Sequence, residues 1–306
     1  MSIDNSFSTF VPKFVLGLSI FSVCLAAPLA KSISTLSPIG IGFWRTMIVG
    51  IAMSVWTLQQ HKSVEDNVSK SVFTQMSTSQ FQWSVLSGVL LGWHFWAWFA
   101  SLQYTSALRS TTLVCLNPIW VGCLQYFFHK NKPHLSFWIG TFLSIIGVFF
   151  MSYVAEDVTV SYIGDLLAIL GGVFGALYLS IGQRVREEVS IQTYGSVICL
   201  SAACSLFLCC LFTGDNLIPT SNQDWVFLLL MALGPQFMGH IGMNYALGYI
   251  PATIVSVLLL LEPVGAGLLA IPMLGEIPKN QEIWGSLIII FGLAIVFYPK
   301  VISKGP

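Results

Sequence analysis

The sequence is poor in charged residues. Only 8% of its 306 residues are charged, whereas about a quarter are charged in an ordinary soluble domain. The formal net charge is zero, so the composition gives no reason to expect a nucleic-acid partner. Because 55% of the residues are hydrophobic and fall in long uncharged runs, we expect a lipid bilayer to surround most of the chain.

The sequence also lacks the motifs that mark common catalytic and cofactor sites. It contains no nucleotide-binding P-loop, no HExxH motif, no Gly-x-Ser-x-Gly turn and no pair of aspartates inside apolar runs. Its seven cysteines lie in apolar runs, and none has zinc-ligand spacing with histidine. We therefore expect no metal and no cofactor, and we predict that the protein is not an enzyme.

Long apolar runs dominate what is present. A membrane-spanning helix needs about 20 apolar residues, and the chain offers ten such runs between polar breaks. The predicted fold class is an all-α polytopic membrane protein with ten transmembrane helices. The runs are 12–30, 38–58, 83–103, 106–127, 135–153, 162–182, 192–212, 224–247, 252–274 and 282–299.

The two halves of the chain repeat one another. A shift of 145 positions places residues 104–151 on the second half without a gap, and five of the identical pairs are glycine or proline. The matches include Tyr104 with Tyr249, Pro118 with Pro263, Gly122 with Gly267, Gly140 with Gly285, and Gly147 with Gly292. We predict two five-helix repeats, over 12–153 and 162–299. Because each repeat has an odd number of helices, the second is inverted relative to the first.

Lys and Arg are distributed unevenly among the predicted loops. If the N-terminal side is called the inside, nine of these residues lie inside and two or three outside. Basic residues accumulate in cytoplasmic loops. The sequence therefore predicts that both termini are cytoplasmic.

Glu262 is the only acidic residue deep inside a predicted span. A carboxylate there costs a few kcal/mol unless it is paired, hydrated or protonated. The neighbouring Pro263 removes a helical hydrogen bond, and the repeat matches this pair with Asn117 and Pro118. Two kinked helices with a polar residue at each kink predict a binding site, with Glu262 as a candidate for proton coupling. The alternative is a carboxyl group that is permanently hydrogen-bonded between helices.

His94 and His240 form a second pair, ten and nine residues before the matched tyrosines. Histidine can bind a proton or a ligand, although a purely structural hydrogen bond stays open for both. Side chains three or four positions apart share a helix face. This spacing adds Trp98 to the face of His94, Trp120 to that of Asn117, and Gln236 and Asn244 to that of His240. The aromatic members of this predicted lining have an alternative role in packing.

Arg45 lies about seven residues into the second predicted span. An arginine within a membrane pairs with another group or extends its side chain to the interface. Both options stay open from the sequence: Arg45 reaches the outer interface, or it contacts a carboxylate of a ligand.

Two segments resemble the drug/metabolite transporter superfamily, EamA type. They are LVCLNPIWVGCLQYFFHKNKPHLSFWIGTFLSIIGVFF (113–150) and LLLLEPVGAGLLAIPMLGEIPKNQEIWGSLIIIFGLAIV (258–296). The second keeps a Gly-Glu pair that the family often has, as Gly275 and Glu276, whereas the first has His129, Lys130 and Asn131 there. The resemblance implies a bundle with a central cavity walled by helices of both repeats.

The resemblance also implies a function. We expect a secondary transporter of a small polar or amphipathic metabolite, such as an amino acid or a derivative, in a bacterial inner membrane. A membrane-embedded enzyme and a passive channel are the alternatives. The sequence leaves the substrate, the direction, the coupling ion and the choice between monomer and dimer open.

Overall fold

The computed structural model describes residues 3–64, 76–104, 107–128, 133–152, 162–274 and 280–302. All regular elements in these ranges are helices, and they form ten segments of membrane length. The segments are α1 (Ile3–Val23) with α2 (Ala26–Ser32), α3 (Pro38–Val64), α4 (Thr78–Ser101), α5 (Ala107–Val114) with α6 (Asn117–Phe128), α7 (Leu135–Ser152), α8 (Tyr162–Arg186), α9 (Ile191–Thr213), α10 (Asn222–Met231) with the π-helix η2 (Ala232–Ile241) and α11 (Gly242–Leu247), α12 (Ala252–Leu258) with the 3₁₀ turn η3 (Leu259–Leu261) and α13 (Glu262–Leu274), and α14 (Asn280–Ile302).

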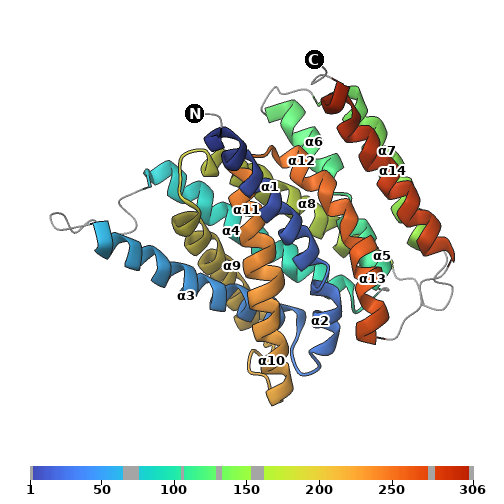
Figure 1. Ribbon diagram of the computed structural model, residues 1–306. Coiled ribbons are helices and arrows are strands. Elements are labelled where there is room, and N and C mark those ends of the chain that lie inside the picture. The colour runs from blue at the N-terminus through green and yellow to red at the C-terminus, as the bar shows by residue number, and fades with distance from the viewer. Residues whose placement is uncertain are drawn as a thin grey trace.

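The segments have the length and the surface of membrane spans. By length and composition, six of the described ones are apolar enough to cross a bilayer, and α7 and α14 contain shorter apolar stretches. Their outward faces carry large apolar side chains such as Phe142 and Phe212, which are 67% and 90% exposed. Helix α1 begins and α14 ends at the same end of the bundle (Figure 1). The predicted all-α polytopic fold is confirmed.

Several helix ends follow local sequence signals. Ser77 begins α4 with a capping box, in which its hydroxyl accepts from the Gln80 N–H while the Gln80 side chain accepts from the Ser77 N–H. Ser190 is the N-cap residue of α9, and its hydroxyl accepts from the Thr193 N–H. Helix α9 ends at Gly214, whose φ of 74° is a left-handed conformation that glycine adopts without steric cost.

The contacts between helices follow the repeat. If the two halves of the chain are exchanged, the main helix–helix contacts are found again. Helices α3 and α9, and α7 and α14, are repeat counterparts, and each packs against its own counterpart. Helix α5 is the counterpart of α12, and α6 is that of α13. The contact of α6 with α12 therefore has its equivalent in the contact of α5 with α13. The contact of α4 with α8 has its equivalent in the contact of α1 with η2 and α11. Such exchange symmetry is expected of an inverted repeat whose two-fold axis lies in the membrane plane.

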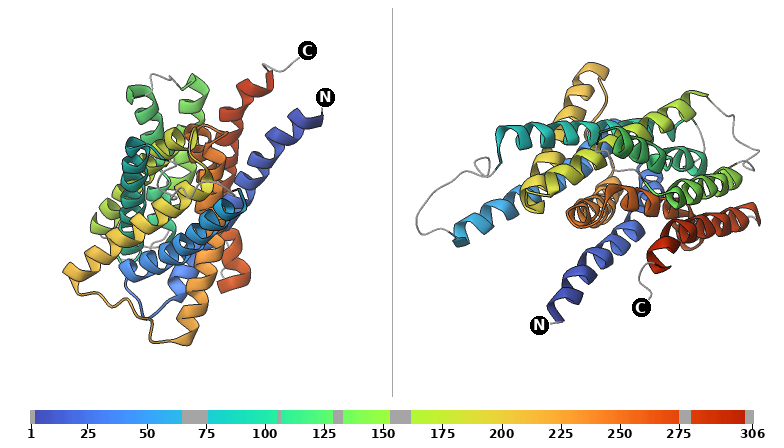
Figure 2. Two further views of the ribbon diagram at one scale, coloured as in Figure 1. Left: turned by 90° about the vertical axis from the view of Figure 1, so that its left-hand side faces the viewer. Right: turned by 90° about the horizontal axis from the view of Figure 1, so that it is seen from above.

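Glycines bring α7 and α14 together along the edge of the bundle. The two helices lie side by side in Figure 1 and in the right-hand view of Figure 2. A Cβ atom on Gly140 would overlap the backbone carbonyl of Gly292, and one on Gly147 would lie 2.7 Å from the carbonyl oxygen of Gly285. These close approaches follow from the absence of side chains. Because the pairs run in opposite order, the helices are antiparallel.

Ser144 marks the centre of this crossing. Its hydroxyl donates to the carbonyl oxygen of Ile289 over 3.1 Å. Ile289 stands 145 positions after Ser144, the same offset that relates the two repeats. The bond therefore joins a residue to its own repeat counterpart, as a contact on the two-fold axis must.

Four prolines interrupt the spans near the centre of the bundle. Pro28 follows the break between α1 and α2, and Pro118 follows the break between α5 and α6. Pro235 lies inside the π-helix η2. Pro263 follows η3, in the first turn of α13. Each lacks the N–H that would continue the helical hydrogen-bond ladder, and the breaks predicted at Pro118 and Pro263 are present.

The protein provides partners for a carbonyl group that such a break releases. Pro263 cannot donate to the carbonyl oxygen of Leu259, which accepts instead from the N–H of Glu262. The Cys115 thiol, from the break opposite, lies 3.6 Å from the same oxygen and donates to it as well. The two repeat-related breaks thus support each other.

The glycine crossing of α7 and α14 is expected to be sensitive to single methyl groups. Gly140→Ala should lower the free energy of unfolding by about 1–3 kcal/mol, because the new methyl group would force the two backbones apart. Thermal unfolding of the purified protein in detergent measures the effect. Gly17→Ala is the matched control, since a Cβ there meets nothing within 4 Å. Equal melting temperatures for both variants would contradict this account of the crossing.

Candidate functional site

A small cavity lies in the centre of the bundle. Its volume is about 30 Å³, which is room for about one or two water molecules. Both repeats contribute to its wall, through α4, α8, η2 and α11 and through the breaks beside α2, α6 and α13. The polar and aromatic members of the wall are His94, Trp98, Asn117, Tyr178, His240 and Glu262.

Asn117 and Glu262 occupy equivalent places in this wall. Each is the first residue of a helix that resumes after a break, α6 and α13. The positive end of the helix dipole at such a start favours anions and hydrogen-bond acceptors. The Asn117 side-chain oxygen is buried and has no hydrogen-bond partner among the described residues. Glu262 is half-buried, and its Oε2 lies 4.0 Å from the Cys115 sulfur.

His94 and His240 meet at the cavity with their ring centroids 6.1 Å apart. The His94 Nδ1 lies 2.8 Å from the carbonyl oxygen of Gly171, so this nitrogen carries a proton and Nε2 is left as an acceptor when the ring is neutral. The His240 Nδ1 lies 3.1 Å from the hydroxyl of Tyr178. Among the described residues, no three His, Cys, Asp or Glu side chains group as metal ligands.

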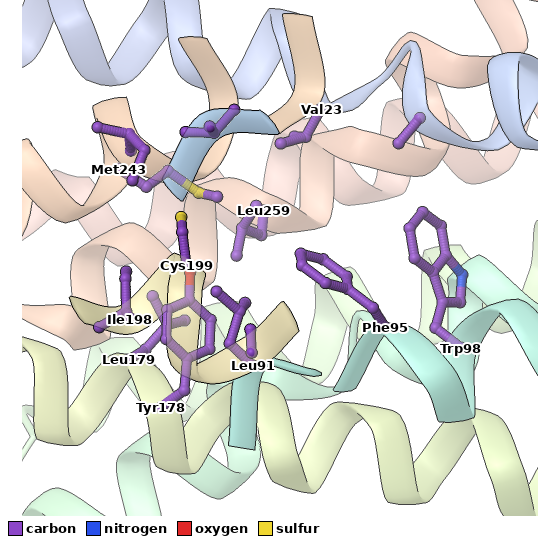
Figure 3. Close-up of a cluster of buried hydrophobic side chains, with 14 of the residues drawn as sticks. Val23, Leu91, Phe95, Trp98, Tyr178, Leu179, Ile198, Cys199, Met243 and Leu259 are labelled. Carbon is purple, nitrogen blue, oxygen red and sulfur yellow. The ribbon is translucent and has the colours of Figure 1, made fainter. Parts of the chain in front are cut away.

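Trp98 supplies an aromatic face and an unused donor. Its ring stacks on that of His94 with centroids 6.3 Å apart and an interplanar angle of 22°. Figure 3 shows Trp98 and Phe95 projecting from α4 on the side where Val23 and Leu259 lie. The indole N–H of Trp98 is buried and has no partner in the part of the chain that the structure describes. A stacking surface next to a free donor suits a ligand with a flat or polar group.

Three residues of the predicted lining lie away from the cavity wall. Trp120 is half-buried against the main hydrophobic core. Gln236 accepts from Arg45, and Asn244 donates to the carbonyl oxygen of His240 over 2.7 Å. Of the expected shared face of Gln236, His240 and Asn244, only His240 lines the cavity. Gln236 lies in the π-helix η2, where it bonds to Arg45, and Asn244 lies in the following helix α11.

Arg45 does not extend to the interface. Its side chain is 0% exposed. The Nε–H donates to Gln236 Oε1 over 2.9 Å, and the guanidinium carbon lies 4.0 Å from the centre of the Phe95 ring. Of the two options that the sequence leaves open, extension to the outer interface does not match this buried position.

Sequence reasoning missed the contribution of α8. Tyr178 lines the cavity, and Gly175 lets α8 approach it. A Cβ on Gly175 would lie 3.0 Å from His94 Nδ1 and 3.1 Å from Asn117 Oδ1. The spacing of Gly171 and Gly175 was a signal for close packing, and extending that face by one turn leads to Tyr178. The segments 129–131 and 275–276, with their contrasting family motifs, lie outside the described residues.

Comparison with known proteins gives the family. The sequence profile described as the EamA-like transporter family matches residues 13–153 and again residues 162–298. The uncharacterized transporter YyaM of Bacillus subtilis (strain 168) is 26% identical over 310 residues, which cover 95% of each chain. An uncharacterized transporter of Archaeoglobus fulgidus is 23% identical, with 84% of this chain and 87% of the relative covered.

A solved crystal structure supports the same fold. It superposes with a TM-score of 0.78 over 96% of this chain and 99% of its own, at 15% sequence identity. That likeness concerns the fold alone. Because the family profile matches both halves of the chain, this multi-pass membrane protein belongs to the EamA-like transporter family.

Proposed function

We propose that the protein is a secondary transporter that moves a small polar or amphipathic metabolite, such as an amino acid or a derivative, by alternating access. The observation that carries the proposal is the position of the cavity, where broken helices of both repeats meet. Substrate sites of carriers with inverted repeats lie at that kind of junction. The transporter family supports the same reading.

The small size of the cavity also fits a carrier. A volume of about 30 Å³ cannot hold a metabolite, so the wall has to separate for a substrate to enter. Because the wall is divided between the repeats, a rocking movement of one against the other opens it on one side at a time. An open pore would need no such separation.

The side chains of the wall suit a substrate with both polar and apolar parts. Trp98 offers a ring for stacking and a free N–H, and Asn117 offers a free carbonyl oxygen. Glu262 supplies a carboxyl group that carries a proton or binds an amine. His94 and His240 add hydrogen-bonding groups at the repeat junction.

The orientation proposed for this carrier places both termini in the cytoplasm of a bacterial cell. Arg184 and Arg186 end α8. The Arg186 Nε–H donates to the carbonyl oxygen of Asn244 in α11, which packs against α1. Basic residues therefore gather at the end of the bundle where the chain begins, as they do on a cytoplasmic face.

Cysteine labelling in intact cells is expected to distinguish the two faces. Glu187 and Asn216 are both exposed, at opposite ends of α9. An impermeant maleimide should label Asn216→Cys but label Glu187→Cys only after the cells are opened, with the unsubstituted protein as control. Labelling of both from the same side would contradict the proposed topology.

Trp98→Ala is expected to weaken binding of the transported metabolite by about 10- to 100-fold, because one buried aromatic ring contributes about 1.5–3 kcal/mol. Counterflow of the labelled metabolite in proteoliposomes measures it. Trp120→Ala is the matched control, since its ring lies outside the wall and should change the apparent affinity much less. Equal losses in both variants would argue that Trp98 acts only in packing.

Glu262→Gln keeps the size and hydrogen bonding of the side chain but removes its titration. We expect it to abolish flux driven by a pH gradient. If Glu262 carries the proton, exchange of substrate for substrate continues, and if it binds an amine, exchange is lost as well. Wild-type rates in both assays would show that Glu262 neither carries the proton nor binds an amine.

A further inference from the structure

Arg45 is a buried cation whose hydrogen bonds are incomplete. Its side chain is 0% exposed, and it lies in α3, well inside the bundle. Within the described part of the chain, only Nε is bonded, to Gln236. Both Nη atoms are buried and lack a hydrogen-bond partner among the described residues. The four N–H donors of the two Nη atoms therefore have no acceptor among the described residues. A buried donor without a hydrogen bond has a high cost in free energy.

The neighbours of Arg45 hold the guanidinium group in place without neutralising it. Gln236 accepts from Nε and in turn donates to the Cys199 sulfur over 3.5 Å. The rings of Phe95 and Phe99 lie 4.0 and 5.7 Å from the guanidinium carbon. Cation–π contacts offset part of the cost of burial but accept no conventional hydrogen bond. These contacts fix the orientation of the two Nη groups and leave their N–H donors without a partner among the described residues.

One ring separates this fork from the central cavity. Phe95 covers the guanidinium group on one side and meets the His240 ring at 90°, with centroids 4.9 Å apart. His240 is part of the cavity wall, as is Trp98, one turn further along α4. Phe95 and Trp98 project from α4 toward the same region (Figure 3). When the wall separates to admit a substrate, Phe95 is the side chain that has to turn for Arg45 to join the site.

No described carboxylate forms an ion pair with Arg45. The acid of the neighbouring cavity wall is Glu262. The other titratable groups that face Glu262 are Cys24 of α1, Cys115 beside α6, His94 of α4, Tyr178 of α8 and His240 of η2. None of these is an anion at neutral pH in its ordinary state. The centre therefore holds one fixed cation and one acid.

We infer that the two Nη groups of Arg45 bind a carboxylate of the transported substrate, which makes the substrate class a carboxylic acid. The inference rests on the proposed carrier function. A planar guanidinium fork with two free N–H edges matches a carboxylate in a bidentate arrangement. The substrate's apolar or polar remainder then lies on the Trp98 side of Phe95, against the wall already described.

A coupling between substrate and proton follows from the same geometry. A bound carboxylate and an ionised Glu262 would place two anions beside one cation, so each disfavours the other. Substrate at Arg45 and a proton on Glu262 therefore favour one another. The carboxylate should bind more tightly as the pH falls, and Glu262→Gln should bind it at least as tightly and with less dependence on pH.

Matched acid and amide pairs test the inference with defined probes: acetate and acetamide, benzoate and benzamide, L-phenylalanine and L-phenylalaninamide. Each is titrated into the purified protein in nanodiscs, with thermal stabilisation as the readout. We expect at least one acid to bind and its amide to bind about 10- to 100-fold more weakly, as loss of a charge-assisted hydrogen bond predicts. Amides that bind as well as acids, or no binding by any acid, would overturn the inference.

Two substitutions separate binding from folding. Arg45→Gln should abolish the response to acids, whereas Arg45→Lys keeps the charge, loses the fork and should retain a weakened response. Arg184→Gln is the matched control, since this arginine is exposed at the end of α8. If Arg45→Gln does not fold, Arg45→Lys provides the test instead. If Arg45→Lys binds an acid and its amide with the same ratio of affinities as the unsubstituted protein, the inference is overturned.

The transport assay separates this inference from the proposed function. Proteoliposomes that carry an amide of the panel at the wild-type rate with Arg45→Gln would sink the carboxylate site and leave the carrier function intact. Wild-type proteoliposomes that exchange no compound of the panel, although an acid stabilises the protein, would instead count against the carrier function.

Discussion

Every peptide group that this chain carries into the hydrocarbon has to find its hydrogen-bond partner within the protein, because lipid offers none. Continuous helices meet this requirement along most of each span. The four prolines interrupt the helical hydrogen bonds that meet it, and each of these prolines is buried inside the bundle. The carbonyl oxygen of Leu259 shows how the demand is met, through Glu262 and Cys115. A polar cavity lies where such breaks converge, walled in part by Asn117 and Glu262 at the breaks.

Residues that act through the backbone made much of the fold predictable. Gly140 and Gly147 recur with their counterparts 145 positions later, and the structure places both pairs in the antiparallel crossing of α7 and α14. Pro118 and Pro263 predicted the breaks beside α6 and α13 for the same reason. Backbone effects of glycine and proline depend little on distant neighbours, so they can be recognised from sequence.

Side-chain environments were harder to predict. His94, Trp98, Asn117, His240 and Glu262 do line one cavity, as their repeat symmetry and spacing indicated, whereas their role in binding stays a prediction. Gln236 and Asn244 do not line the cavity with His240, because both side chains are engaged in other hydrogen bonds. Gln236 bonds to Arg45 and Cys199, and Asn244 donates to the carbonyl oxygen of His240. The setting of Arg45 depends on Gln236 and Phe95, which come from distant parts of the chain, and position along one helix carries no information about them.

The pairing of α7 with α14 has a consequence for how the protein is made. It joins the last helix of the first repeat to the last described helix of the second. At translation rates of about 5–20 residues per second, the 145 positions that separate their corresponding residues take roughly 7–30 seconds to synthesise. During that interval the glycine face of α7 lacks the helix against which it packs in the folded protein. Folding of the first repeat is therefore not complete until the second repeat has been made.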